Sequence, residues 1–208
     1  MSDLFDRAMA LRELLDSGRH FRRELPVEDA VASCCADLME AGEPQLALDL
    51  LDRASQFGFS DRERELRFAV LRVRALRIAG LYEDGLAYAD SVLDTLSDVE
   101  SAPAVLVQLI RVAHAACLWQ LNRVDAAVQR LSSIRSELMS KPDSEATARC
   151  ALELSSAEIF RGRLDSGREH AMEAIVSARR CRDRYAESVA LGNLGRIEKF
   201  LCRWAQRY

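Results

Sequence analysis

The sequence predicts an all-α protein, a solenoid of antiparallel helix hairpins, and two observations lead to this fold class. Only four prolines and nine glycines interrupt the 208 residues, and aromatic residues make up only 6%. Helix formers such as alanine and leucine therefore dominate over the β-branched and aromatic residues that favour strands. The second observation is an internal repeat of about 40 residues, which is typical of helical repeat proteins.

The first element expected is an amphipathic helix over Leu4–Leu15 that ends near Ser17. Its apolar side is assigned to Phe5, Met9, Leu11, Leu14 and Leu15. Terminal repeats need an altered outer face, so this helix is expected to cap the array. Pro26 marks a boundary before the next helix. The sequence thus predicts a capping segment at residues 1–25 and a repeat domain at residues 26–208, with about four and a half repeats and the last one truncated.

Five short segments of similar pattern each follow an apolar stretch of helical period. Their middle residues are Gly42, Gly80, Asn122, Gly162 and Cys202, and these lie 38, 42, 40 and 40 residues apart. Glycine and asparagine accept the left-handed backbone conformation that ends many helices. An apolar residue or proline follows two residues later, where a second helix is expected to begin. Each segment therefore predicts a tight turn between two helices.

The helix that follows each of the first four turns repeats its own pattern. A small residue lies five positions after the turn, at Ala47, Gly85, Ala127 and Gly167. Further positions on the same helical face hold Leu51 and Ala54, Ala89 and Val92, Leu131 and Ile134, and Ala171 and Ala174. The small residue is expected to let the two helices of a hairpin approach closely, since a large side chain there would overpack the contact.

These patterns resemble those of the tetratricopeptide repeat family. The spacing Leu191-x2-Leu194-Gly195-x2-Glu198 matches the family's first helix except at its two aromatic positions, and Ala47-x3-Leu51-x2-Ala54 is similar to its second helix. The chain departs from the family in its longer repeat and in its lack of large aromatic residues. The resemblance covers the chain from about Glu28 onward. A generic helical bundle is the alternative fold.

The resemblance implies a right-handed α-solenoid that recognises a protein or peptide. Repeats of this length look like those of bacterial signal-responsive transcription activators and of helical adaptor proteins. A regulatory or sensing part of a larger bacterial signalling or transcription-regulatory protein is therefore expected. Two other functions stay open, a sensor of a small molecule or peptide signal and a helical repeat that binds nucleic acid. The step from fold to function rests here on family likeness alone.

In this family the first helix of each hairpin lines a concave surface, which places a candidate groove on three stripes. The stripes are Arg67, Arg74 and Arg77 around Val70 and Leu71; Val112, Ala116 and Trp119; and Val189, Asn193, Arg196 and Lys199. Arginine side chains bind carboxylates through two parallel hydrogen bonds, so the expected partner carries acidic side chains or a C-terminal carboxylate. Trp119 is a candidate aromatic anchor. The alternative is that the arginines are solvated and Trp119 lies in the core.

Catalytic residues are not expected, and the chain is predicted not to be an enzyme. His114 and Cys117 are three residues apart on one helix, but a nucleophile and base need a third, orienting group, so they are interpreted as core neighbours. Gly192 and Gly195 are attributed to helix packing. The six cysteines form no C-x-x-C pair. They predict buried thiols in a reducing cytoplasm, with neither a metal site nor a cofactor.

Charge and end sequences restrict the partners further. The net charge is −4, whereas nucleic-acid-binding domains usually carry a basic excess. Asp183 and Glu187 interrupt the cluster formed by Arg179, Arg180, Arg182 and Arg184, which is interpreted as a helix-end pattern. No signal peptide or membrane-spanning stretch is expected, so the predicted location is the cytoplasm. The segment Trp204–Tyr208 is expected to begin a second helix, which would leave an apolar face for further repeats or for a second copy of the chain.

Overall fold

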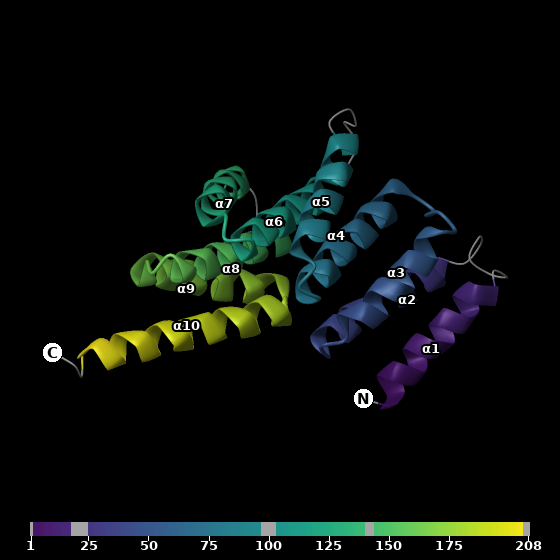
Figure 1. Ribbon diagram of the computed structural model, residues 1–208, viewed down its shortest axis with the longest axis horizontal. Coiled ribbons are helices and arrows are strands. Elements are labelled where there is room, and N and C mark those ends of the chain that lie inside the picture. The colour runs from purple at the N-terminus through teal and green to yellow at the C-terminus, as the bar shows by residue number, and fades with distance from the viewer. Residues whose placement is uncertain (1, 18–24, 97–102, 140–143, 206–208) are drawn as a thin grey trace. The chain divides into compact units, whose positions relative to one another are not determined.

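The computed structural model describes residues 2–17, 25–96, 103–139 and 144–205, without the side chains of residues 2, 25, 26 and 202–205. All regular secondary structure in these ranges is α-helical (Figure 1). The helices are α1 (Ser2–Ser17), α2 (Leu25–Glu40), α3 (Pro44–Ser55), α4 (Arg62–Ile78), α5 (Tyr82–Leu96), α6 (Ala104–Gln120), α7 (Val124–Leu138), α8 (Glu145–Phe160), α9 (Leu164–Cys181) and α10 (Arg184–Ala205). The all-α prediction is therefore confirmed for this part of the chain. The chain divides into two compact units, Met1–Ala113 and His114–Tyr208.

Four of the five predicted turns form, and all four share one geometry. Their middle residues, Gly42, Gly80, Asn122 and Gly162, have φ of 83°, 78°, 62° and 77°. In each turn the next N–H donates to the carbonyl five residues earlier, as Arg163 N does to Glu158 O at 2.9 Å. This bond satisfies a helix-end carbonyl and requires a left-handed residue in the turn. The glycine and asparagine positions therefore follow from local backbone physics.

The predicted turn at Cys202 is wrong, because α10 continues through this residue. Cysteine has a Cβ that disfavours the left-handed conformation, and it lacks the local hydrogen bonding that helps asparagine adopt it. A fifth turn of the same type forms instead at Arg182, where φ is 60° and Asp183 N donates to Ala178 O at 2.9 Å. The Asp183 carboxylate then accepts from Ala186 N at 3.0 Å and so caps α10.

In the first unit, α1 packs on α2 and α3. Its inward face is Leu4, Ala8, Leu11 and Leu15, with Leu14 beside it. Phe5 is 54% exposed, which corrects its assignment to the apolar side. The spacing i, i+4, i+7, i+11 from Leu4 already fills the contact, and Phe5 lies one position off that stripe. Ion pairs between Arg7 and Asp37 (2.9 Å) and between Arg53 and Asp16 lie at the rim of α1.

The hairpins of the first unit are α2 with α3 and α4 with α5, and α2 also packs on α4. The predicted inner positions Ala47, Leu51 and Ala54 of α3 are buried. Buried Glu28 joins the two hairpins, because its carboxylate accepts from Ser60 N (3.0 Å) and Ser60 Oγ (2.8 Å) and lies 2.9 Å from Arg64 Nε. Helices α1 and α2 therefore each contact the helices one and two places ahead in sequence.

The second unit is organised around α8, which packs on α7, α9 and α10. Helices α8, α9 and α10 lie side by side in Figure 1. A Cβ at Gly167 would lie 2.9 Å from Ile159 Cγ1, so the predicted close approach of α8 and α9 is confirmed. By contrast, a Cβ at Gly192 or Gly195 would meet nothing within 4 Å. Helix packing therefore does not explain these two glycines, which are on the exposed face of α10.

Candidate functional site

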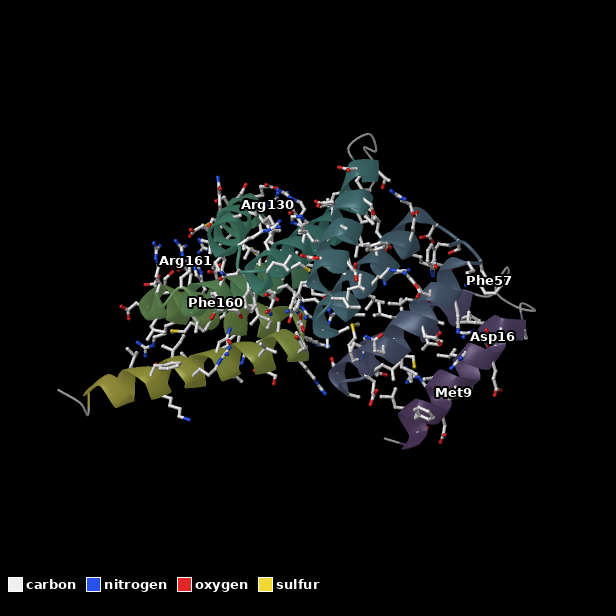
Figure 2. All side chains as sticks on the ribbon, in the orientation of Figure 1. Met9, Asp16, Phe57, Arg130, Phe160 and Arg161 are labelled. Atoms are coloured by element: carbon white, nitrogen blue, oxygen red, sulfur yellow. The ribbon has the colours of Figure 1, made fainter. Side chains whose placement is uncertain are left out.

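Trp119 is held by a buried carboxylate between the first helices of two hairpins of the second unit. Its Nε1 donates to Glu153 Oε2 at 3.0 Å, and Glu153 is only 6% exposed. The indole also packs on Phe160, with ring centroids 6.2 Å apart and planes tilted by 52°. Phe160 is 57% exposed at the end of α8 (Figure 2). The Trp119 ring is thus fixed and half-buried, and the Phe160 ring beside it is exposed to solvent.

Helix α10, the first helix of the last hairpin of this unit, contacts α8 through Asn193. The Asn193 amide donates to Ser155 Oγ at 3.2 Å and Ser156 Oγ at 3.0 Å, and its carbonyl accepts from Arg196. Asn193 is 0% exposed. It therefore lies inside the packing, where it positions Arg196, and the prediction that it contacts a partner directly is wrong. A buried amide is stable there because hydroxyl and guanidinium groups satisfy it.

The remaining predicted groove residues of this unit divide by exposure. Arg196 and Lys199 are exposed on α10, as a contact surface requires. Ala116 is buried, and so is Val112 at the end of the first unit, so Trp119 alone of the α6 stripe reaches the surface. We call Trp119, Glu153, Phe160, Asn193 and Arg196 the α6–α8–α10 face.

The sequence pattern did not predict Glu153 or Phe160, although the register of Glu153 carried a usable signal. Glu153 lies nine residues before Gly162, just as Asn193 lies nine residues before Cys202. A carboxylate among the alanines and leucines of α8 indicates a buried polar contact, because a buried charge persists only with a partner. Applying the groove register to α8 would therefore have found this residue.

The arginine stripe of α4 belongs to the first unit. Val70 and Leu71 are buried, as an apolar floor requires. Arg67 is exposed and pairs with Glu63 at 2.6 Å. Arg74 and Arg77 are half-buried and interact with other groups of the chain. The stripe thus shares one helix face, but intramolecular partners already engage its guanidinium groups.

A cavity of about 410 Å³ opens between α7, α8 and α9 of the second unit. Sequence analysis did not predict it. Met139, Met172 and Val176 form its exposed apolar mouth, whereas Leu138, Cys150 and Ser177 lie buried at its floor. We call it the α7–α8–α9 cavity. Its described lining includes no residue of the α6–α8–α10 face.

Charged groups lie at the edge of this cavity. Glu173 accepts from Arg135 Nε through both carboxylate oxygens at 3.0 Å, and His170 Nδ1 lies 3.5 Å from Glu173 Oε2. The contact with His170, together with Arg135, lowers the pKa of Glu173 below its usual value even though partial burial opposes this shift. Arg180 also lines the cavity. Glu173 is therefore ionised at neutral pH.

The remaining residues that the sequence singled out lie in the packed interior or at a helix end. His114 and Cys117 are buried, and Arg130 Nη1 lies 3.0 Å from His114 Nδ1. Arg179 and Arg180 occupy the last turn of α9, which confirms the helix-end interpretation for these two residues.

The cysteines at 34, 35, 117 and 150 are buried, as predicted, whereas Cys181 is only half-buried, which corrects its assignment to the buried thiols. Burial raises the pKa of the Cys35 thiol to about 12.

Within the described ranges, no helix combines the length and apolarity needed to cross a bilayer, and no three His, Cys, Asp or Glu side chains converge as metal ligands. No protein-family model and no curated protein matches the sequence.

Proposed function

We propose that this chain is a helical-repeat scaffold that recognises a protein or peptide through the α6–α8–α10 face. The observation that carries this proposal is the exposed Phe160 ring packed on Trp119, whose indole is fixed by buried Glu153. Aromatic residues with little freedom left to lose are the usual anchors of protein interfaces. An exposed aromatic side chain on a rigid helix end therefore fits recognition better than catalysis.

Two exposed basic residues of α10 support an acidic partner. Arg196 is exposed, with its guanidinium held by Asn193, and Lys199 lies exposed one turn further along α10. A held guanidinium loses little entropy when it binds a carboxylate. Acidic side chains or a C-terminal carboxylate beside an apolar residue are the proposed features of the partner.

A right-handed α-solenoid is the proposed arrangement of the hairpins. It is supported by the recurring left-handed turns and by packing between helices one and two places apart in sequence. The resemblance to tetratricopeptide repeats further supports a regulatory or sensing role. Solution X-ray scattering tests the arrangement, because an elongated superhelical particle has a larger radius of gyration than a compact bundle of 208 residues.

Site-specific photocrosslinking tests the recognition surface in the full chain. Benzoylphenylalanine replaces Phe160 in one protein and Phe5 of α1, which is similarly exposed at 54%, in the control. A discrete protein adduct is expected from position 160 only. The captured partner is then purified, and its affinity is measured for the unmodified chain and for variants.

Phe160→Ala and Arg196→Glu are each expected to weaken that affinity about tenfold or more, whereas Phe5→Ala leaves it unchanged. Equal adducts from positions 160 and 5, or unaltered affinity in both face variants, would refute the proposal. The double variant Arg74→Glu/Arg77→Glu tests separately whether the α4 stripe contributes to recognition. Circular dichroism confirms that each variant is folded.

A further inference from the structure

The mouth of the α7–α8–α9 cavity gathers apolar side chains that are open to solvent. Met139, Met172 and Val176 are 69%, 54% and 48% exposed, and all three line the same cavity. Large apolar side chains around a concave opening mark binding sites on protein surfaces. Methionine is flexible and polarisable, so it adapts to ligands of different shapes and makes favourable contacts with aromatic rings. The mouth is therefore suited to an apolar molecule with a ring system.

The floor and the volume of the cavity fit a small molecule. Leu138 and Cys150 are buried at the floor, and the Cys150 thiol donates to Leu131 O at 3.3 Å. The volume of about 410 Å³ falls within the range of roughly 300–1,000 Å³ that small-molecule sites occupy. The cavity thus offers an apolar molecule a covered floor and enough room.

The charged residues of the described lining, Arg135, Glu173 and Arg180, already interact within the chain. Arg135 Nε donates to both carboxylate oxygens of Glu173 at 3.0 Å. Arg180 also interacts with another group of the chain. A charged ligand would have to compete with these contacts and would lose part of its hydration on entry. The lining therefore favours a ligand without charge.

The two hydroxyl residues of this lining, Thr147 and Ser177, are engaged as well. Thr147 Oγ1 lies 3.1 Å from Ser144 Oγ, and Ser177 has an interaction within the chain. Water that enters the cavity has to share groups that are already engaged, and an apolar group that displaces such weakly held water gains affinity. Apolar contact is therefore expected to hold the ligand.

We propose that the α7–α8–α9 cavity binds a small uncharged apolar molecule, with its ring system between Met139, Met172 and Val176 and over the floor formed by Leu138 and Cys150. This ligand site goes beyond protein recognition and lies on other residues than the α6–α8–α10 face. The chain then has one surface for a macromolecule and another for a small apolar compound.

Fluorescence titration of the full chain tests the proposal with N-phenylnaphthylamine, an uncharged aromatic compound that emits more strongly in apolar surroundings. A saturable rise is expected, and the affinity should not depend on salt because no charge takes part. The matched ligand is anilinonaphthalene sulfonate, which has the same ring skeleton and a negative charge, and it is expected to bind more weakly. Equal or tighter binding of the sulfonate, or no saturable rise, would overturn the proposal.

Methionine-methyl NMR locates the bound N-phenylnaphthylamine. The five methionines of the chain are Met1, Met9, Met39, Met139 and Met172. Saturable shifts are expected at Met139 and Met172 only, because these two line the cavity. Equal shifts at every methionine, or none at Met139 and Met172, would contradict the assignment of the site.

Two exposed valines provide a matched pair of variants. Val176→Glu places a carboxylate in the mouth and is expected to weaken binding of N-phenylnaphthylamine about tenfold or more. Val105→Glu makes the same change at a valine of α6 that is 44% exposed and lies outside the cavity lining, so it should leave binding unchanged. Equal effects of the two substitutions would refute the site. Phe160→Ala should leave binding intact, so that failure of this site and failure of the recognition face are distinguishable.

Discussion

Arg149 of α8 and Asp183 at the start of α10 form an ion pair inside the second unit. Arg149 Nε lies 2.6 Å from Asp183 Oδ2, and Arg149 Nη2 donates to Asp183 Oδ1 at 3.1 Å. The two side chains are only 10% and 7% exposed. The guanidinium also lies 4.6 Å from the centre of the Tyr185 ring. The fifth turn and the start of α10 are therefore held onto α8 by one buried charge pair.

Arg149→Met should destabilise the second unit strongly, because Asp183 then stays buried without its partner. A loss of about 3–5 kcal/mol is expected for breaking such a pair. The double variant Arg149→Met/Asp183→Asn should recover part of this loss, since asparagine still caps α10 without a charge. Urea unfolding monitored by circular dichroism measures both. Arg179→Met, at the exposed pair with Glu187 on the same corner, is the control and should cost less than about 1 kcal/mol.

The turns at Gly162 and Arg182 share the same left-handed conformation. Substitutions at the two positions are therefore predicted to change stability in opposite directions. Gly162→Ala should lower stability by about 1 kcal/mol, because φ is 77° there and alanine disfavours positive φ. Arg182→Gly should raise stability by up to about 1 kcal/mol, since glycine relieves the strain at φ 60° but has more freedom in the unfolded chain. Urea midpoints measure the two shifts. An Arg182→Gly variant less stable than Arg182→Ala would contradict the strain argument.

Adding one methyl group to α9 should lower stability, whereas adding one to α10 should raise it. Gly167→Ala forces a Cβ to within 2.9 Å of Ile159 Cγ1, and overpacking of this kind costs about 1–3 kcal/mol. Gly195→Ala meets open space on α10 and should stabilise by up to about 1 kcal/mol through helix propensity. Thermal unfolding of the two variants measures the difference. Equal melting temperatures would show that α8 and α9 do not approach as closely as described.

The ion pair of Glu173 should make stability depend on pH. The lowered pKa of Glu173 means that its contribution is complete above the unfolded pKa of about 4.3 and disappears as pH falls through the folded value. Glu173→Gln should therefore be less stable than the unmodified chain at pH 7, by at most about 1 kcal/mol because solvent screens the pair. The difference should vanish in acid. Glu169→Gln, at an exposed position of α9, is the control and should show no such pH dependence.

Turns were predictable from the sequence because their cause is local. Gly42 and Gly162 can adopt positive φ without help from tertiary contacts. The hydrogen bonds that close each turn also span only a few residues. Arg182 was missed for the complementary reason. Its left-handed conformation is imposed by contacts of Asp183 with Arg149 and with Ala186 N, and arginine itself has no preference for it.

The candidate site was only partly predictable. Trp119 is half-buried and Arg196 is exposed, as the predicted groove requires, but Asn193 is buried, and the exposed Phe160 was not predicted. A helical stripe tells which residues share a face, and it does not tell how closely the next helix covers that face. The α7–α8–α9 cavity depends on the spacing of three helices, which no single stretch of sequence encodes.

By itself, the sequence determined that the described chain is helical, where four of its turns lie and which small residues stand at helix crossings, because propensity and left-handed glycine act within a few residues. Tertiary structure alone decided which polar residues are buried together, as Glu153 with Trp119 and Arg149 with Asp183. Those pairs lie 34 residues apart in sequence. A buried charge is stable only when packing brings its partner within hydrogen-bond distance, so these contacts exist only once the helices have docked.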